Sequence, residues 1–219
     1  MIELAAFFGN PGKEYARNRH NAGFLLAEKL PFYADLAWQK KFRGSYAAMD
    51  RYRLTDYFPG ATSQEGGGRL HFIKPETFMN LSGESVSRAA SFFKIKIEDV
   101  IVVHDELELP LGTISLKFGG GLGGHNGLRS MKASFGSADF WRLRIGIGRP
   151  DSRLPGEGGP PGSGEGIIDW VLSDFDAAEA ETLNRVLEAG AALLLGTFVD
   201  GPESLLPEWA KKKLPELPE

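Results

Sequence analysis

Residues 2–12 read IELAAFFGNPG and set the fold class of the chain. The first seven of these residues are mostly apolar or aromatic, which is typical of a buried strand. The closing Gly-Asn-Pro-Gly is a run of turn-forming residues, so we expect the strand to end there in a tight turn. A helix is predicted next, at about 21–30. The chain therefore begins with a strand, a turn and a helix.

Strands and helices continue to alternate along the chain. Residues 100–103 are all β-branched, which is typical of a central strand. Residues 143–147 alternate apolar side chains with Arg144 and Gly146, which predicts a strand with one polar face. Further strands are predicted at 69–73 and 113–118, and helices at 82–93 with Ser82 as N-cap, from 126 onward, and at 176–199. This alternation predicts an α/β fold in which helices cover both faces of a sheet.

Length and composition favour one globular domain. A chain of 219 residues fits a single hydrophobic core, and 42% hydrophobic with 25% charged residues excludes disorder of the whole chain. The absence of cysteine excludes disulfides, thiolate nucleophiles and thiolate-bound metals. The chain opens without a basic segment, and no apolar run reaches the ~20 residues of a membrane span, so we expect a cytoplasmic protein.

The net charge of −4 conceals an uneven distribution of charge. Residues 13–53 carry nine basic against four acidic residues, and residues 111–149 carry six against one, so each stretch has a charge of +5. Residues 151–219 carry five basic against fourteen acidic residues, a charge of −9. The basic stretches could bind phosphates, although ordinary solvated surfaces show the same pattern.

Glycine gathers in three segments. Residues 150–166 consist largely of Gly and Pro, and residues 62–68 are similar, so both are predicted to be flexible loops. Residues 119–124 match the spacing of a dinucleotide-binding loop between a strand and a helix. We reject that interpretation because the motif belongs on the first strand of such a fold, whereas this one lies in mid-chain before His125.

Four histidines are candidate bases or ligands: His20, His71, His104 and His125. None of them has the spacing of a metal-ligand pair, so we predict no metal site. His71 and His104 are assigned to structure. His20 lies just beyond the first turn, which carries Asn10, and is the candidate base.

Asp105 follows the apolar strand at 100–103, at the carboxyl end where open α/β sheets place their sites. A carboxylate there can accept a hydrogen bond from an imidazole, fix its tautomer and raise its basicity. Glu106 and Glu108, in contrast, are predicted to be solvated.

Three asparagines are candidate substrate ligands. Asn10, Asn80 and Asn126 lie in loops or at a helix start. One such asparagine is usually only a turn residue, but three beside a candidate base favour an ester or peptide held by paired donors and acceptors.

Four blocks of sequence carry a resemblance to a known family. They read FGNPGKEYARNRHNAGF at 8–24, KPETFMNLSG at 74–83, HDELELP at 104–110 and GGGLGGHNGL at 119–128. Together, and in this order, they resemble the bacterial peptidyl-tRNA hydrolase family. The resemblance spans about residues 2–200.

The resemblance implies a single-domain three-layer sandwich with a twisted mixed central sheet surrounded by helices. Residues 1–200 would form the peptidyl-tRNA hydrolase-like catalytic domain, with the Gly/Pro-rich loop at 150–166 and a C-terminal tail at 201–219. It also implies a monomeric cytoplasmic esterase that uses no cofactor and binds no membrane. Such an enzyme hydrolyses the ester between tRNA and a peptide, or an N-blocked aminoacyl group, and recycles tRNA lost from ribosomes. Its partner is peptidyl-tRNA, through the acceptor arm and the peptide.

Residue roles follow by position from the resemblance. His20 is the base, Asp105 holds it in its basic form, and Asn10 resembles the residue that separates N-blocked from free aminoacyl-tRNA. The remaining positions resemble substrate or tRNA contacts, with Lys117 and Arg144 at the tRNA 5′ phosphate and His125 beside it: Tyr15, Phe78, Asn80, Asn126, His125, Lys117 and Arg144.

These assignments predict that His20, oriented by Asp105, takes a proton from the water that attacks the ester carbonyl. Side-chain amides and backbone N–H groups, including those at the helix start near Asn126, are the expected oxyanion donors. The alternative is an RNA-binding protein without catalysis, similar to organellar intron-splicing factors of the same fold. The presence of His20, Asp105 and Asn10 favours the enzyme.

Overall fold

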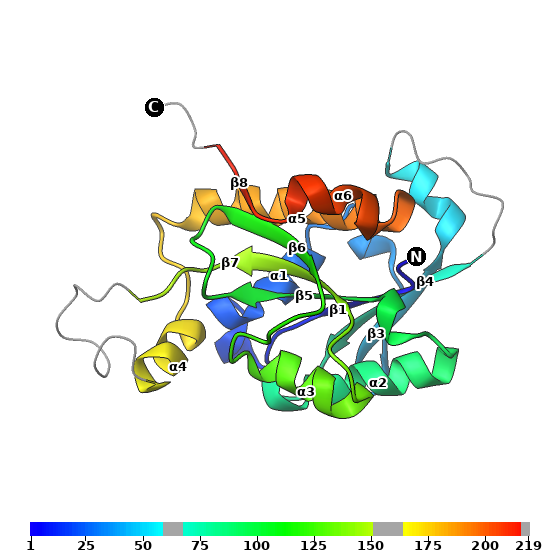
Figure 1. The fold of residues 1–219 in the computed structure, drawn as a ribbon, viewed down its shortest axis with the longest axis horizontal. Coiled ribbons are helices and arrows are strands. Elements are labelled where there is room, and N and C mark those ends of the chain that lie inside the picture. Colours follow the sequence, from blue (N-terminus) through cyan, green and yellow to red (C-terminus); the bar gives the residue numbers. More distant parts are fainter. Residues whose placement is uncertain (59–67, 151–163, 216–219) are drawn as a thin grey trace.

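The computed structural model describes residues 1–58, 68–150 and 164–215. The strands in these residues form one eight-stranded mixed sheet with the order β2-β3-β4-β1-β5-β7-β6-β8 (Figure 1). The strands are β1 (Leu4–Phe7), β2 (Gln39–Lys41), β3 (Gly44–Asp50), β4 (Arg69–Pro75), β5 (Val100–Glu106), β6 (Thr113–Phe118), β7 (Trp141–Gly146) and β8 (Lys212–Lys213).

Two kinds of helix connect these strands. The α-helices are α1 (Ala22–Ala27), α2 (Ser82–Phe93), α3 (Asn126–Phe135), α4 (Gly164–Leu172), α5 (Ala180–Val199) and α6 (Pro202–Trp209). The 3-10 helices are η1 (Lys13–Tyr15), η2 (Arg19–Asn21), η3 (Tyr33–Asp35), η4 (Arg51–Asp56), η5 (Met79–Leu81) and η6 (Ile97–Asp99).

Helices cover both faces of the sheet, with α2 and α3 on one side and α5 and α6 on the other (Figure 1). Val86 of α2 and Met131 of α3 are buried in the same core as Val102 of β5. Val103, the next residue of that strand, points to the opposite face and is buried with Leu194 of α5. This alternation follows from the period of two in a strand. The predicted three-layer α/β sandwich with a mixed sheet is thereby confirmed.

The candidate residues Asn10, His20 and Asp105 lie at the carboxyl edge of the sheet. β1, β4, β5 and β7 run parallel, so their carboxyl ends meet at one edge, with Asp105 paired in register with Ile145. At Gly23 the first turn of α1 approaches this edge very closely. A Cβ atom there would lie 2.5 Å from the carbonyl oxygens of Phe8 and Val103, so only glycine allows the approach. The residues just before α1 are therefore held against the ends of β1 and β5.

The structure corrects one local prediction and shows that a second feature is buried. Ser82 is not the N-cap of α2, because Leu81 occupies that position and the Ser82 hydroxyl instead contacts Sδ of Met79 at 3.9 Å. The strand predicted at 143–147 has the expected polar face, but that face is almost entirely buried, as is the rest of β7. Arg144 on this face donates to the side chains of Ser115 and Glu106, and Arg142 donates to backbone carbonyls, as described below.

Residues 202–213 lie within the predicted C-terminal tail and form α6 and β8. β8 pairs antiparallel with β6, with Lys212 opposite Ile114. The segment predicted as a flexible loop at 62–68 lies outside the described residues except for its last residue. The one predicted at 150–166 lies outside them except for its ends, and residues 164–166 begin α4.

Among the described residues, α5 is the one helix whose length and apolar composition would suffice to cross a membrane. Of its apolar window, 56% is buried inside the protein, as expected of a helix that packs against a sheet.

Candidate active site

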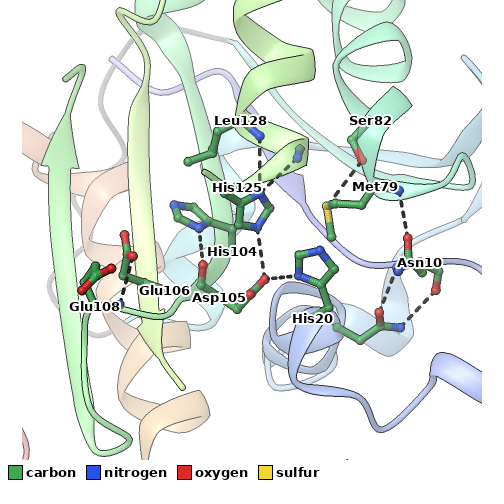
Figure 2. A network of polar contacts seen from close by, with 12 residues as sticks. Asn10, His20, Met79, Ser82, His104, Asp105, Glu106, Glu108, His125 and Leu128 are labelled. Carbon is green, nitrogen blue, oxygen red and sulfur yellow. Dashed lines mark hydrogen bonds and ion pairs between the residues drawn. The ribbon is translucent and has the colours of Figure 1, made fainter. Parts of the chain in front are cut away.

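Two histidines converge on one carboxylate at the carboxyl edge of the sheet (Figure 2). Asp105 lies at the end of β5, His20 in η2 just before α1, and His125 at the N-cap of α3. Nδ1 of His20 lies 2.9 Å, and Nε2 of His125 3.1 Å, from the same oxygen, Oδ1 of Asp105. The structure thus brings together three of the predicted site residues from three different elements.

The hydrogen bonds of His125 define its tautomer. Its Nδ1 accepts from the backbone N–H groups of Gly127 at 3.1 Å and Leu128 at 3.4 Å, so this nitrogen carries no proton. The proton of the neutral ring is therefore on Nε2, which donates to Asp105. His125 caps α3 with one nitrogen and holds the carboxylate with the other. The N–H groups of Gly127 and Leu128 are consequently occupied, so these two cannot serve as the expected oxyanion donors.

His20 presents a free basic nitrogen. An ionised Asp105 only accepts, so Nδ1 of His20 must carry the proton of their 2.9 Å hydrogen bond. The lone pair of the neutral ring then lies on Nε2, to which no described residue hydrogen-bonds. The His20 residue is 8% exposed. A mostly buried imidazole with its basic nitrogen unengaged is suited to take a proton from a bound molecule.

The electrostatics of the pair keep the carboxylate charged. Burial raises the pKa of Asp105, but the facing His20 and His125, through their charges and hydrogen bonds, hold that pKa well below its usual range. Burial lowers the pKa of His20, and the charge and hydrogen bond of Asp105 outweigh this effect and raise it above 6.5. Asp105 therefore makes His20 a stronger base than an isolated histidine.

His104 contacts both Asp105 and His125. Its Nδ1 donates to the carbonyl oxygen of Asp105 at 2.6 Å, and its ring lies edge-on to His125 with centroids 4.9 Å apart. Complete burial, followed by the charge of His125, keeps the pKa of His104 well below 6.5, so the ring is neutral. These contacts agree with the structural role predicted for His104.

Asn10 is held through both its side chain and its peptide group (Figure 2). Its Oδ1 accepts from the N–H of Met79 at 2.8 Å, which leaves the Nδ2 donors without a partner among the described residues. Its peptide group pairs twice with the side chain of Asn21, through N–H to Oδ1 at 2.8 Å and Nδ2 to the carbonyl at 3.1 Å. A pocket of about 420 Å³ lies beside Asn10 and Asn21 and is also lined by Phe24 and Lys74.

The remaining predicted substrate contacts lie around this site. Phe78 is 60% exposed at the N-cap of η5, and Asn80 is exposed within the same 3-10 helix that supplies the Met79 N–H. Asn126 is exposed at the first position of α3, next to His125, and Tyr15 is half-buried at the end of η1. Their amide and phenol groups hydrogen-bond to no described residue.

Lys117 and Arg144 lie on neighbouring strands beside the site. Burial, and then the positive charges of Arg144 and Arg142, lower the pKa of Lys117. Arg144 donates to Ser115 Oγ at 2.7 Å and to Glu106 Oε2 at 3.3 Å. The prediction that Glu106 is solvated was therefore wrong, since its side chain is 12% exposed and paired with Arg144. Three cationic side chains, those of Lys117, Arg142 and Arg144, therefore lie close to a single carboxylate, that of Glu106.

Arg142 is a structural residue of this region that the sequence analysis missed. It is 1% exposed, and its guanidinium donates to the carbonyl oxygens of Gly119, Gly120 and Gly121, at 2.9 Å for Gly120 and 2.7 Å for Gly121. This buried cation holds the glycine-rich loop that leads to His125. Arg142 lies on the same face of β7 as Arg144, which the sequence analysis had assigned to a polar face.

The three groups at the centre are also close enough for a metal ion, since one ligand atom each from His20, Asp105 and His125 lies within 4.8 Å of the others. Their hydrogen bonds fit this use poorly. A metal on Nε2 of His125 would displace the proton that this nitrogen donates, and Nδ1 cannot take it up without losing the N–H groups of Gly127 and Leu128. The arrangement fits a proton-accepting pair better than a cation site.

Comparisons with known proteins point to one family. The family model described as "Peptidyl-tRNA hydrolase" matches residues 4–216. The peptidyl-tRNA hydrolase of Treponema pallidum (strain Nichols) is 43% identical over 216 residues, covering 97% of this chain and 96% of its own. That of Desulfitobacterium hafniense (strain Y51) is 39% identical over 189 residues, covering 86% of this chain and 89% of its own.

Solved structures agree with these relatives. The crystal structure of peptidyl-tRNA hydrolase from Acinetobacter baumannii superposes with a TM-score of 0.78 and 31% identity, covering 98% of this chain and 97% of that one. The similarity in sequence and structure thus extends over nearly the whole chain.

Proposed function

The chain belongs to the peptidyl-tRNA hydrolase family and hydrolyses peptidyl-tRNA, and on this premise we propose that His20 is the base of the reaction, oriented by Asp105. The observation that carries the proposal is the 2.9 Å contact between Nδ1 of His20 and Oδ1 of Asp105, which leaves Nε2 of His20 basic and unengaged. This is the orientation that histidine needs for base-assisted hydrolysis.

Nε2 of His20 takes a proton from a water molecule as the water oxygen attacks the ester carbonyl. The carbonyl carbon becomes tetrahedral, and the imidazolium that forms is stabilised by the buried carboxylate of Asp105. The same proton then passes to the ribose oxygen as the bond between this oxygen and the carbonyl carbon breaks. The products are a free carboxyl group on the peptide and a free hydroxyl on tRNA. No serine or cysteine nucleophile is required.

Asn10 supplies donors beside the base. Because Met79 fixes the orientation of its amide, the Nδ2 hydrogens of Asn10 are available to a carbonyl oxygen of the substrate. We assign to it the selection of N-blocked over free aminoacyl groups, since a blocked amine offers an amide carbonyl where a free amine offers a cation. Tyr15, Phe78, Asn80 and Asn126 surround the same site as substrate contacts.

Lys117 and Arg144 are assigned to the tRNA end of the substrate, with His125 beside them. Their closeness to Arg142 produces a local excess of positive charge that a phosphate would relieve, and this explains why an acidic chain can bind RNA. Glu106 partly neutralises Arg144, so Lys117 carries the larger share of phosphate binding.

We further propose a monomeric enzyme, and a cytoplasmic one because ribosomes release its substrate. Residues 1–200 are its catalytic domain, extended by β8, which pairs with β6 in the same sheet. The alternative, an RNA-binding protein without catalysis, is not favoured because the family and the relatives are named as hydrolases.

The test compares N-acetylaminoacyl-tRNA with the same aminoacyl-tRNA left unblocked, each incubated with the wild-type protein at equal concentration. We expect rapid release of the N-acetyl amino acid and little release from the unblocked substrate. Binding of both RNAs without release from either would overturn the enzymatic assignment and support the binding protein.

A further inference from the structure

Both sequence neighbours of His20 are held by distant parts of the chain. On the carboxyl side, Asn21 forms the two hydrogen bonds with the peptide group of Asn10 described above. On the amino side, the backbone N–H of Arg19 donates to the carbonyl of Ser173 at 2.9 Å. His20 therefore lies between two fixed points, and the second of these has no role in the reaction described so far.

The side chain of Arg19 is fully engaged. It is 4% exposed, and its guanidinium donates to both carboxylate oxygens of Glu179, at 2.8 and 2.7 Å. Nε of Arg19 also donates to Oγ of Ser173 at 3.2 Å. A bidentate hydrogen bond of this kind fixes the orientation of the two side chains as well as their separation, because guanidinium and carboxylate are both planar.

Aromatic rings complete the enclosure of Arg19. The guanidinium carbon lies 3.7 Å from the ring centroid of Trp170 and 4.8 Å from that of Phe175. A flat guanidinium can stack on a ring and bond to a carboxylate at its edge simultaneously, whereas an ammonium group can do neither in the same way. The site is therefore specific for arginine.

Glu179 is itself fixed by the start of α5. Its backbone N–H donates to Oδ1 of Asp176 at 2.8 Å, and the N–H of Asp176 donates to Oε2 of Glu179 at 2.9 Å. This reciprocal pair closes the turn that precedes α5, and Glu179 is itself the N-cap residue of that long helix. Arg19 thus connects the turn that carries His20 to the N-terminus of α5.

The turn needs such support. η2 has only three residues, and no side chain in the described part of the chain caps its N-terminus. A single 3-10 turn has weak hydrogen-bond geometry and does not by itself fix the direction of a side chain. Because Arg19 is buried and its charge is paired with Glu179, it reaches neither solvent nor substrate, and it can act on the reaction only through the placement of its neighbour.

We propose that Arg19, clamped by Glu179, Ser173 and Trp170, is a positioning residue that holds His20 in hydrogen-bond contact with Asp105. This inference rests on the proposed role of His20 as the base. If so, the segment after α4, which contains Ser173 and Glu179, must remain packed against η2 for His20 to be correctly placed.

The test uses Arg19→Lys and Glu179→Gln, which approximately preserve side-chain size but remove the bidentate hydrogen bond between residues 19 and 179. The matched control is Arg51→Lys, since Arg51 also ties α5 to the sheet, donating to the carbonyls of Phe198 and Ile2, but at the opposite edge. Two quantities are measured for each variant: the pKa of His20 by NMR of its ring nitrogens, and kcat with KM on N-acetylaminoacyl-tRNA.

We expect both clamp variants to lower the pKa of His20, because the groups that face its ring are Asp105 from β5 and His125 from α3, and a looser contact with Asp105 removes the influence that raises it. We expect kcat to fall about 10- to 100-fold with little change in KM, as for a misplacement of the order of 1 Å. The double variant should behave like either single one, and Arg51→Lys should change neither quantity.

The proposal is overturned if the clamp variants keep the wild-type pKa of His20 and kcat while losing thermal stability as the control does. It is also overturned if only KM changes. A lowered pKa of His20 with unchanged kcat would support the clamp and contradict the role of His20 as base, so the two failures are distinguishable. Glu179→Gln keeps the inference testable if Arg19→Lys does not fold.

Discussion

Nδ1 of His20 lies 2.9 Å from Oδ1 of Asp105, although the two residues are 85 positions apart in the chain. The parallel pairing of β1 and β5 brings their carboxyl ends to one edge of the sheet. The close approach of Gly23 to the carbonyl groups of Phe8 and Val103 holds η2 against that edge. At this edge the buried carboxylate of Asp105 raises the pKa of His20 through its negative charge and its hydrogen bond. The fold thus supplies both the position and the protonation behaviour of the base.

The pH dependence of hydrolysis follows from the pKa of His20. A base must be neutral, so kcat/KM should rise with pH through an apparent pKa above 6.5. In Asp105→Asn the carboxylate that raises this pKa is lost and burial remains, so the acid limb should shift to lower pH. The plateau should also fall, because an amide no longer fixes the ring in the required tautomer. An acid limb at an unchanged pH in Asp105→Asn would contradict this account.

Two substitutions at Asn10 separate its structural from its functional contact. Asn10→Ala leaves the buried N–H of Met79 without an acceptor, and we expect it to cost about 1–3 kcal/mol in the free energy of unfolding. Asn10→Asp keeps an acceptor for that N–H but removes the free Nδ2 donors. It should therefore retain most of the stability and still lose hydrolysis of N-acetylaminoacyl-tRNA. Denaturant unfolding and initial rates, measured on both variants, check this; wild-type rates in Asn10→Asp would exclude the amide donors.

The phosphate contact assigned to Lys117 is tested by salt. Neutralising one phosphate with one cation changes the slope of log affinity against log salt by about 0.7 to 0.9. Lys117→Ala should therefore weaken tRNA binding and flatten this slope by about one contact, while Lys96→Ala, an exposed lysine at the start of η6, should leave it unchanged. Equal slopes for the wild type and Lys117→Ala would remove this residue from the phosphate site.

Acid should destabilise the fold through buried neutral histidines. Burial and then the charge of Arg69 lower the pKa of His71 from 6.5 to about 4, so between these values the unfolded chain binds a proton that the folded chain does not. The stability contributed by neutral His71 is complete above pH 6.5 and is lost as the pH falls to about 4. His104 acts in the same direction. Denaturant unfolding from pH 7 to 4.5 should show this decline, and a flat profile would contradict it.

Much of the central site could be predicted because it follows simple patterns. An unbroken run of β-branched residues identifies β5 as a central strand, and the first acidic residue after this run is Asp105. His20 follows a strand-ending turn at the same edge. Because the carboxyl ends of parallel strands lie at one edge of a sheet, the α/β pattern places both residues at that edge. Their contact also requires that β1 pairs with β5, which only the structure shows.

Residues that act by tertiary contact could not be predicted in this way. Arg142 has the spacing of a solvent-facing strand residue, and only the folded glycine-rich loop shows that it lies buried beneath backbone carbonyls. Arg19 likewise has no local signal, since Glu179 lies 160 positions away. β2 and β3 were missed for a different reason: their sequence lacks a clear apolar alternation, and they are held by pairing with β4.

The most direct test of the central claim is a single-turnover measurement of N-acetylaminoacyl-tRNA hydrolysis by the wild type and His20→Ala at saturating enzyme. Removal of a general base typically costs about 10²- to 10⁴-fold in rate, and we expect a loss in this range with tRNA binding retained. A His20→Ala protein that hydrolyses the ester within a few fold of the wild-type rate would contradict the assignment of His20 as the base.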